Sequence, residues 1–129
     1  MGTQQFSETM PLIDPFIFDN SSGIGQQYFG NATHRETRVD AILVGQNDTI
    51  DHVFNLFFDV AGLTVPLGSV NIPAGSGYLG LPMIDVLAAI LPVGSAGLAL
   101  PSGTDFLASL DVAMTGSSTL SVLQLGGTL

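Results

Sequence analysis

Short stretches in which apolar and polar residues alternate, each ended by glycine or proline, most constrain the fold of this chain. Residues 52–60 are the clearest case, because Phe54, Leu56, Phe58 and Val60 would lie on one face of an extended strand. A repeat of two is typical of a β-strand with one face in a core. The 129 residues include 16 glycines and 7 prolines, which divide the chain into short segments. The sequence therefore predicts an all-β protein.

Further strands are predicted on the same grounds. The segment 63–72 contains Pro66 and Gly68, so it should be an edge strand or a bulged one. The remaining candidates are residues 15–19, 38–44, 98–100, 105–114 and 119–125. One helix is predicted over 83–91, with Pro82 at its first position, Asp85 in its first turn and Pro92 at its end. This helix should be buried nearly all round.

About six or seven short strands and one short helix predict an antiparallel β-sandwich or jelly-roll-like domain over residues 36–129. Residues 42–44 and 57–58 are apolar on both faces of their strands. Because a sandwich buries only one face of each sheet, the second face needs the N-terminal segment, the helix or another subunit as cover.

Residues 1–35 have no sustained period, but aromatic residues are spaced along them. Two interpretations are open. The segment is an extended N-terminal arm that reaches a neighbouring subunit, or it is a first strand plus loops that pack on the domain's own core. The arm interpretation assigns the contacts to Phe16, Phe18, Tyr28, Phe29, Arg35 and Arg38.

Charged residues are scarce and almost all acidic. The chain has 11 acidic residues, two arginines and no lysine, for a net charge of -9. Only 10% of residues are charged, against an average of about 25% in soluble domains. Two arginines cannot neutralise a row of phosphates, so nucleic-acid binding is excluded as the main function. An apolar chain with so few charges is expected to hide part of its surface in an oligomer or larger assembly.

No membrane segment is expected. Residues 81–100 have the length of a membrane span, but they contain Asp85 and two prolines and are predicted to be a core segment. Residues 1–10 are polar and lack the basic and apolar regions of a secretory signal.

No motif indicates catalysis or a cofactor. The chain has no cysteine and only two histidines, His34 and His52, too few for a zinc site built on histidine. Asn47, Asp48 and Asp51 offer oxygens to a calcium ion, but the segment lacks the spacing of a calcium loop and also suits a polar hairpin turn. We therefore predict no enzyme, no cofactor and no metal site.

Residues 38–129 resemble the small β-sandwich proteins that tailed bacteriophages encode. The segments that carry the resemblance are Val39–Val44, Asn47–Thr49, Asp51–Leu56, Gly68–Gly77, Leu100–Thr104 and Gly126–Gly127. Proteins of this kind are commonly virion components, either capsid decoration (cement) proteins or tail accessory proteins. Proteins of this kind have no catalytic residues, so the resemblance implies none in this sequence.

The resemblance implies a non-enzymatic virion structural protein that binds and stabilises the major capsid shell. Its expected partners are itself, as a homo-oligomer such as a trimer, and a major capsid or other virion protein. Two other classes remain open. One is a tail or spike accessory protein or carbohydrate-binding module for host-surface attachment, and the other is a small oligomeric hydrolase or cupin-like enzyme.

Overall fold

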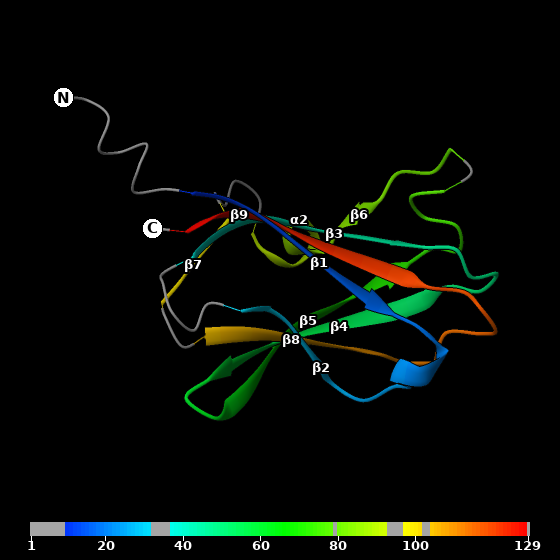
Figure 1. The fold of residues 1–129 in the computed structure, drawn as a ribbon, viewed down its shortest axis with the longest axis horizontal. Helices are drawn as coiled ribbons and strands as arrows, with labels where there is room; N and C mark the ends of the chain where they lie inside the picture. Colours follow the sequence, from blue (N-terminus) through cyan, green and yellow to red (C-terminus); the bar gives the residue numbers. More distant parts are fainter. Residues whose placement is uncertain (1–9, 32–36, 79, 93–96, 102–103, 129) are drawn as a thin grey trace.

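The computed structural model describes residues 10–31, 37–78, 80–92, 97–101 and 104–128. Within these residues most of the regular secondary structure is β-strand (Figure 1). The elements are β1 (Met10–Phe18), the 3₁₀ helix η1 (Asn20–Ser22), β2 (Gln27–Asn31), β3 (Thr37–Gln46), β4 (His52–Val60), β5 (Leu63–Ile72), β6 (Ile84–Asp85), α2 (Val86–Ile90), β7 (Leu98–Leu100), β8 (Thr104–Leu110) and β9 (Leu120–Thr128).

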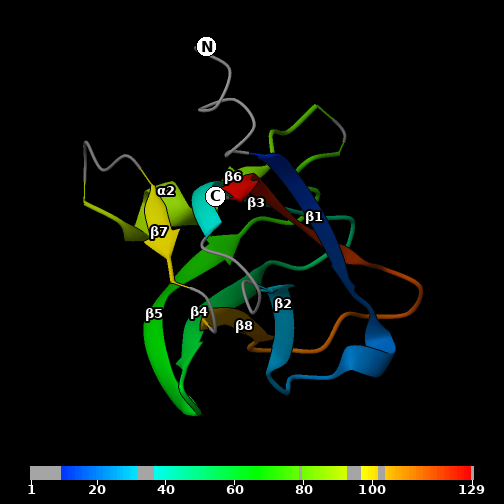
Figure 2. The ribbon, with the colours of Figure 1, turned by 60° about the vertical axis from the view of Figure 1, so that its left-hand side comes forward.

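The strands form two antiparallel sheets that face each other (Figure 2). The five-stranded sheet has the order β1-β9-β3-β6, and β7 also pairs with β3. The four-stranded sheet has the order β2-β8-β4-β5. This architecture confirms the predicted antiparallel β-sandwich with one short helix.

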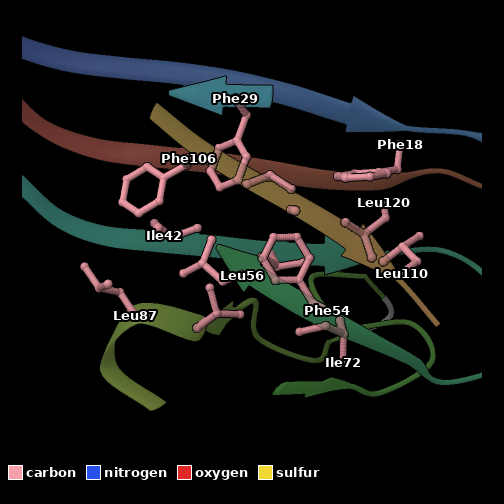
Figure 3. Packing of buried hydrophobic residues seen from close by; sticks show 14 of the residues in the cluster. Phe18, Phe29, Ile42, Phe54, Leu56, Ile72, Leu87, Phe106, Leu110 and Leu120 are labelled. Carbon is pink, nitrogen blue, oxygen red and sulfur yellow. The ribbon is translucent and has the colours of Figure 1, made fainter. Parts of the chain in front are cut away.

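The core lies between the sheets and is rich in phenylalanine (Figure 3). Phe18 from β1 and Phe29 from β2 both pack near Phe54 of β4, with ring centroids 6.3 Å away in each case. Phe29 also stacks on Phe106 of β8 at 5.4 Å. Such aromatic pairs contribute about 0.5–1.5 kcal/mol each beyond the area they bury. Strands from both ends of the sequence therefore share one core.

Several predicted strands are confirmed, with differences at their ends. β4, β5 and β7 have the expected bounds. β8 ends at Leu110, before the predicted Met114, because the Asp111 carboxylate accepts the backbone N–H groups of Val53 and Val112 and turns the chain. β9 continues through Gly126 and Gly127 to Thr128, beyond the predicted end of the strand at residue 125.

A bulge changes the faces expected for β3. The pairing with β9 shifts register between Val39 and Ala41. Simple alternation would place Val39 with Ala41 and Leu43, but Val39, Ile42 and Val44 are the buried residues. An extra residue in one strand reverses the alternation beyond it. The face prediction for Val39 was therefore wrong.

The expected N-terminal arm is, over its described residues 10–31, part of the sandwich. β1 pairs with β9 along its whole length, and β2 pairs with β8. Burial of Phe18 and Phe29 in the core supplies the driving force for this pairing. The interpretation as a first strand plus loops is the correct one for this segment, and residue 35 is not a domain boundary, since each sheet contains strands from both sides of it.

The helix is shorter and less buried than expected. The side chain of Asp85 caps it by accepting the backbone N–H of Ala88 at 3.2 Å, so Asp85 precedes the helix instead of lying in its first turn. Val86 and Leu87 are buried, whereas Ala88 and Ala89 are exposed. The helix contacts β3 and β5 and closes one side of the sandwich. Among the described residues, no helix has the length and apolar character needed to cross a membrane.

Candidate interaction surface

The outer face of the five-stranded sheet is apolar, and no helix or strand of the described residues crosses β1, β9 and β3 on this side. Side chains of β1, β9 and β3 that point away from the core line up in register. Leu43 lies opposite Leu123, which lies opposite Pro15, and Ala41 lies opposite Leu125. In the next row Gly45 lies opposite Ser121, and Ser121 lies opposite Ile17. We call Pro15, Ile17, Ala41, Leu43, Leu123 and Leu125 the outer apolar face.

Charge is absent from these rows. All six side chains are partly or fully exposed, and Ile17 is 57% exposed. The charged residues nearest to the outer apolar face lie at its borders, where Asp85 of β6 neighbours Leu43 and Arg38 pairs with Asp40. Leaving this many aliphatic side chains in water is unfavourable, by about 25 cal/mol for each Å² of apolar surface. A second apolar surface placed on this face would therefore be stabilised.

One end of the outer apolar face is hollowed. The β5–β6 loop folds over β3 there, and the Gln46 N–H donates to the Ser76 carbonyl at 2.8 Å. A cavity of about 280 Å³ lies beside it, lined by Gly45, Gly77, Tyr78, Met83 and Ser121. Tyr78 is 41% exposed, so an aromatic ring borders the apolar rows. This end could hold a protruding side chain of a partner.

Hydrogen bonds of the buried Asp48 and His52 side chains join the β3–β4 connection and the start of β4 to the β8–β9 connection. His52 Nε2 lies 2.8 Å from Asp48 Oδ2, and His52 Nδ1 lies 3.0 Å from the Val112 carbonyl oxygen. Asp48 also accepts the Thr115 hydroxyl at 2.5 Å and the Thr49 N–H at 2.7 Å. Burial opposes ionisation of Asp48, but the hydrogen bonds from Thr115 and His52 outweigh it and hold the pKa of Asp48 well below its usual value.

Hydrogen bonds within the chain involve the side-chain oxygens of Asn47, Asp48 and Asp51, the candidate ligands of a calcium ion. The Asp48 carboxylate accepts the Thr115 hydroxyl and the Thr49 N–H. Asp51 accepts the Ala74 N–H at 2.9 Å, and Asn47 Oδ1 accepts the Thr119 N–H at 2.7 Å. The three side chains thus hold three different parts of the chain. No group of three or more His, Cys, Asp or Glu residues suited to a metal occurs in the described part of the chain. The arrangement is that of a polar turn held by hydrogen bonds.

The aromatic residues assigned to the arm do not form a contact surface together. Phe18 is fully buried, Phe29 is 5% exposed, and Phe16 packs against the core with its ring 5.1 Å from that of Phe18. For Phe18 and Phe29 the assignment as free anchors is wrong, because a side chain that fills the core cannot reach a neighbour. Phe16 is partly buried.

Among the four aromatic residues assigned to the arm, Tyr28 is the exposed one. It is 58% exposed on the outer face of the four-stranded sheet, where it lies opposite Leu107. Its hydroxyl donates to Asp59 Oδ2 at 2.8 Å. This hydrogen bond, together with the negative charge of Asp59, raises the pKa of Tyr28. Tyr28 and Phe57 flank Leu107 in register, and Leu107 is only 4% exposed, so part of the second apolar face is covered within the chain.

The two arginines are not equally placed. Arg38 forms an exposed ion pair with Asp40, with Nε 3.0 Å from Oδ1. Arg35 lies outside the described residues. A pair of this kind contributes about 0–1 kcal/mol, so the Arg38 interaction needs no partner protein to explain it.

The outer apolar face was only partly found from the sequence. Apolar residues on both faces of β3 indicated that one face lacked cover, but the contributions of β1 and β9 depend on pairing between residues far apart in the chain.

Comparison with known proteins adds no relative, since no family model, curated protein or solved structure matches the chain.

Proposed function

We propose that this chain is a non-enzymatic virion structural protein of the capsid decoration type, which assembles into a homo-oligomer through its outer apolar face. The observation that carries the proposal is the charge-free character of that face in a chain with a net charge of -9. Copies that met through any acidic surface would repel each other. Two copies that packed their outer apolar faces would bury aliphatic surface without bringing acidic groups together.

The role in a virion rests on the resemblance of residues 38–129 to small phage β-sandwich proteins. A decoration protein works by many weak, repeated contacts, which sum once the geometry lets them engage together. A carbohydrate-binding role would be favoured by a shared aromatic platform. Tyr28 lies on the outer face of the four-stranded sheet and Tyr78 lies in the β5–β6 loop, so these two rings do not form one.

The assembly step is tested by light scattering coupled to size-exclusion chromatography. We expect the unaltered chain to elute as an oligomer and the double variant Leu43→Asp/Leu123→Asp to elute as a folded monomer. The control is Ile24→Asp/Ser117→Asp, which adds the same charge at two exposed loop positions. A monomeric unaltered chain, or a control that dissociates equally, would contradict the assembly step.

The virion step is tested separately with empty shells of the major capsid protein encoded in the same genome. The unaltered chain should sediment with the shells, and the Leu43→Asp/Leu123→Asp variant should sediment more weakly because it loses multivalency. An oligomer that stays in the supernatant would refute the decoration role while leaving the assembly step intact.

A further inference from the structure

The hairpin formed by β4 and β5 projects beyond the five-stranded sheet. Its turn lies far from β1, β9 and β3 in both ribbon views (Figure 1, Figure 2). Phe58 of β4 still packs against the core, and its ring lies 5.2 Å from that of Phe106. Val60, two residues later on the same face, is 42% exposed. The inner face of the hairpin therefore leaves the core between these two residues.

The tip of this hairpin is apolar on its inner face. Val60 pairs with Leu63, and Phe58 pairs with Val65, so Val60, Leu63 and Val65 share that face. Leu63 is 71% exposed and Val65 is 46% exposed. Leu63 is the most exposed of the large hydrophobic residues in the described part of the chain. We call Val60, Leu63 and Val65 the hairpin tip.

The backbone of the turn that joins β4 and β5 is strained. Ala61 and Gly62 both have positive φ, at 52° and 85°. A two-residue turn of this type usually begins with Asn, Asp or Gly. Alanine in this conformation costs about 1–2 kcal/mol. Strain of this kind is found preferentially at functional positions.

The outer face at the base of the hairpin is acidic. Asp59 of β4 lies directly opposite Asp105 of β8, and like charges in this position destabilise a sheet. Oδ1 of each carboxylate is shielded from water and has no hydrogen-bond partner among the described residues. The ion pairs of the described residues are Arg38–Asp40 and Asp48–His52, so neither Asp59 nor Asp105 is neutralised there.

We propose that the hairpin docks with a different protein, in an apolar groove whose rim carries arginine or lysine. The hairpin tip would fill the groove, and a cation of the rim would offset the charge of Asp59 and Asp105. A second copy of this chain does not fit, because it has a net charge of -9 and only two arginines, of which Arg38 already pairs with Asp40. The inference adds a second surface to the proposed function, and its test does not depend on a capsid shell.

The test is an NMR titration of the full ¹⁵N-labelled chain with a synthetic 12-residue peptide of alternating leucine and arginine. A matched peptide carries glutamate in place of arginine. We expect shift changes with the arginine peptide only, confined to residues 57–66 and to Asp105, which lies opposite Asp59. Leu63→Ser should weaken binding about tenfold or more, because a leucine leaves an apolar site. Asp59→Asn should weaken binding at low salt, and this difference should disappear at high salt.

The control variant is Ile24→Ser, which removes a side chain that is 60% exposed in the η1–β2 loop and should leave binding unchanged. Unperturbed amide resonances in the rest of each variant show that it is folded. Absence of shift changes at millimolar peptide, equal binding of the glutamate peptide, or equal weakening by Ile24→Ser would overturn the proposal. If the resonances of the hairpin tip shift when the protein alone is concentrated, the tip binds a second copy of the chain. If they shift when phosphatidylcholine vesicles are added, the tip binds a membrane. Either result overturns the proposal.

Discussion

Two buried glutamine side chains differ in whether their polar atoms are hydrogen-bonded. Gln46 and Gln124 are both fully buried. Gln46 donates to the carbonyl oxygens of Ile50 and Ile72 and accepts the Asp48 N–H. Both side-chain polar atoms of Gln124 lack a hydrogen-bond partner among the described residues. A buried amide without partners is unfavourable, whereas a bonded one stabilises the turn that it connects.

This contrast predicts opposite effects for the same substitution. Gln124→Met should raise the free energy of unfolding by about 1–3 kcal/mol, because it removes an unsatisfied amide and conserves volume. Gln46→Met should lower it by about 1–3 kcal/mol, because it leaves backbone groups without partners. Urea unfolding of both variants measures the difference. A loss of stability in Gln124→Met comparable to that in Gln46→Met would show that Gln124 is hydrogen-bonded in solution.

The buried pair of Asp48 and His52 gives a second prediction at this scale. Asp48→Ala should lower the free energy of unfolding by about 1–3 kcal/mol or more, because it leaves the buried His52 ring and the Thr115 hydroxyl without the carboxylate that they bond. Asp40→Ala removes the exposed partner of Arg38 and should change the free energy of unfolding by about 1 kcal/mol or less. Chemical unfolding near neutral pH compares the two variants. Similar effects of both would mean that the buried pair is not formed.

Asp48 should also set the acid limit of stability. Its pKa is lower in the folded chain than in the unfolded chain, so the folded state releases the proton more readily. The stabilising contribution is therefore present above the unfolded value of about 3.9 and is lost as the pH falls below it. Thermal unfolding between about pH 6 and pH 2 should show a steeper loss for the unaltered chain than for Asp48→Asn. Parallel curves would contradict this assignment.

At the scale of elements, β3 and β9 approach each other at a bulge that only glycine permits. A Cβ atom on Gly126 would lie 1.8 Å from the Arg38 carbonyl oxygen. The close approach is therefore part of what fixes the register of the five-stranded sheet. It also explains why the strand continues through Gly126 and Gly127, beyond its predicted end at residue 125.

Gly126→Ala should therefore separate β3 from β9 locally and lower the free energy of unfolding by about 1–3 kcal/mol or more. The matched control is Gly25→Ala, since a Cβ atom on Gly25 would meet no atom within 4 Å. The control should stay within about 0.5 kcal/mol of the unaltered chain. Hydrogen exchange of the amides of β3 and β9 would localise the effect, and an unchanged exchange pattern would contradict it.

For the whole molecule, charge and apolar surface act against each other. The net charge of -9 makes separate molecules repel each other, while the outer apolar face favours their association. Near the isoelectric point of about 4.1 the repulsion disappears. Light scattering at low ionic strength should therefore show larger particles between about pH 5 and pH 4 than at pH 7. The Leu43→Asp/Leu123→Asp variant should show a smaller increase, and an equal increase would assign the association to another surface.

Much of the fold follows from the sequence itself. Alternation of apolar and polar residues determined β4 and β5, since consecutive side chains of an extended strand point to opposite faces. The scarcity of charge indicated that some apolar surface would remain exposed on the folded chain. Both properties are local or compositional, so they are present before any long-range contact forms.

Only the tertiary structure decided where the N-terminal segment lies and which face stays uncovered. β1 pairs with β9, more than 100 residues later, because Phe16 and Phe18 fill a core that the other strands create. The close contact at Gly126 sets the bulge that reverses the faces of β3. Backbone pairing between distant strands has no signature in consecutive residues, so the outer apolar face and the hairpin tip appear only when the sheets are assembled.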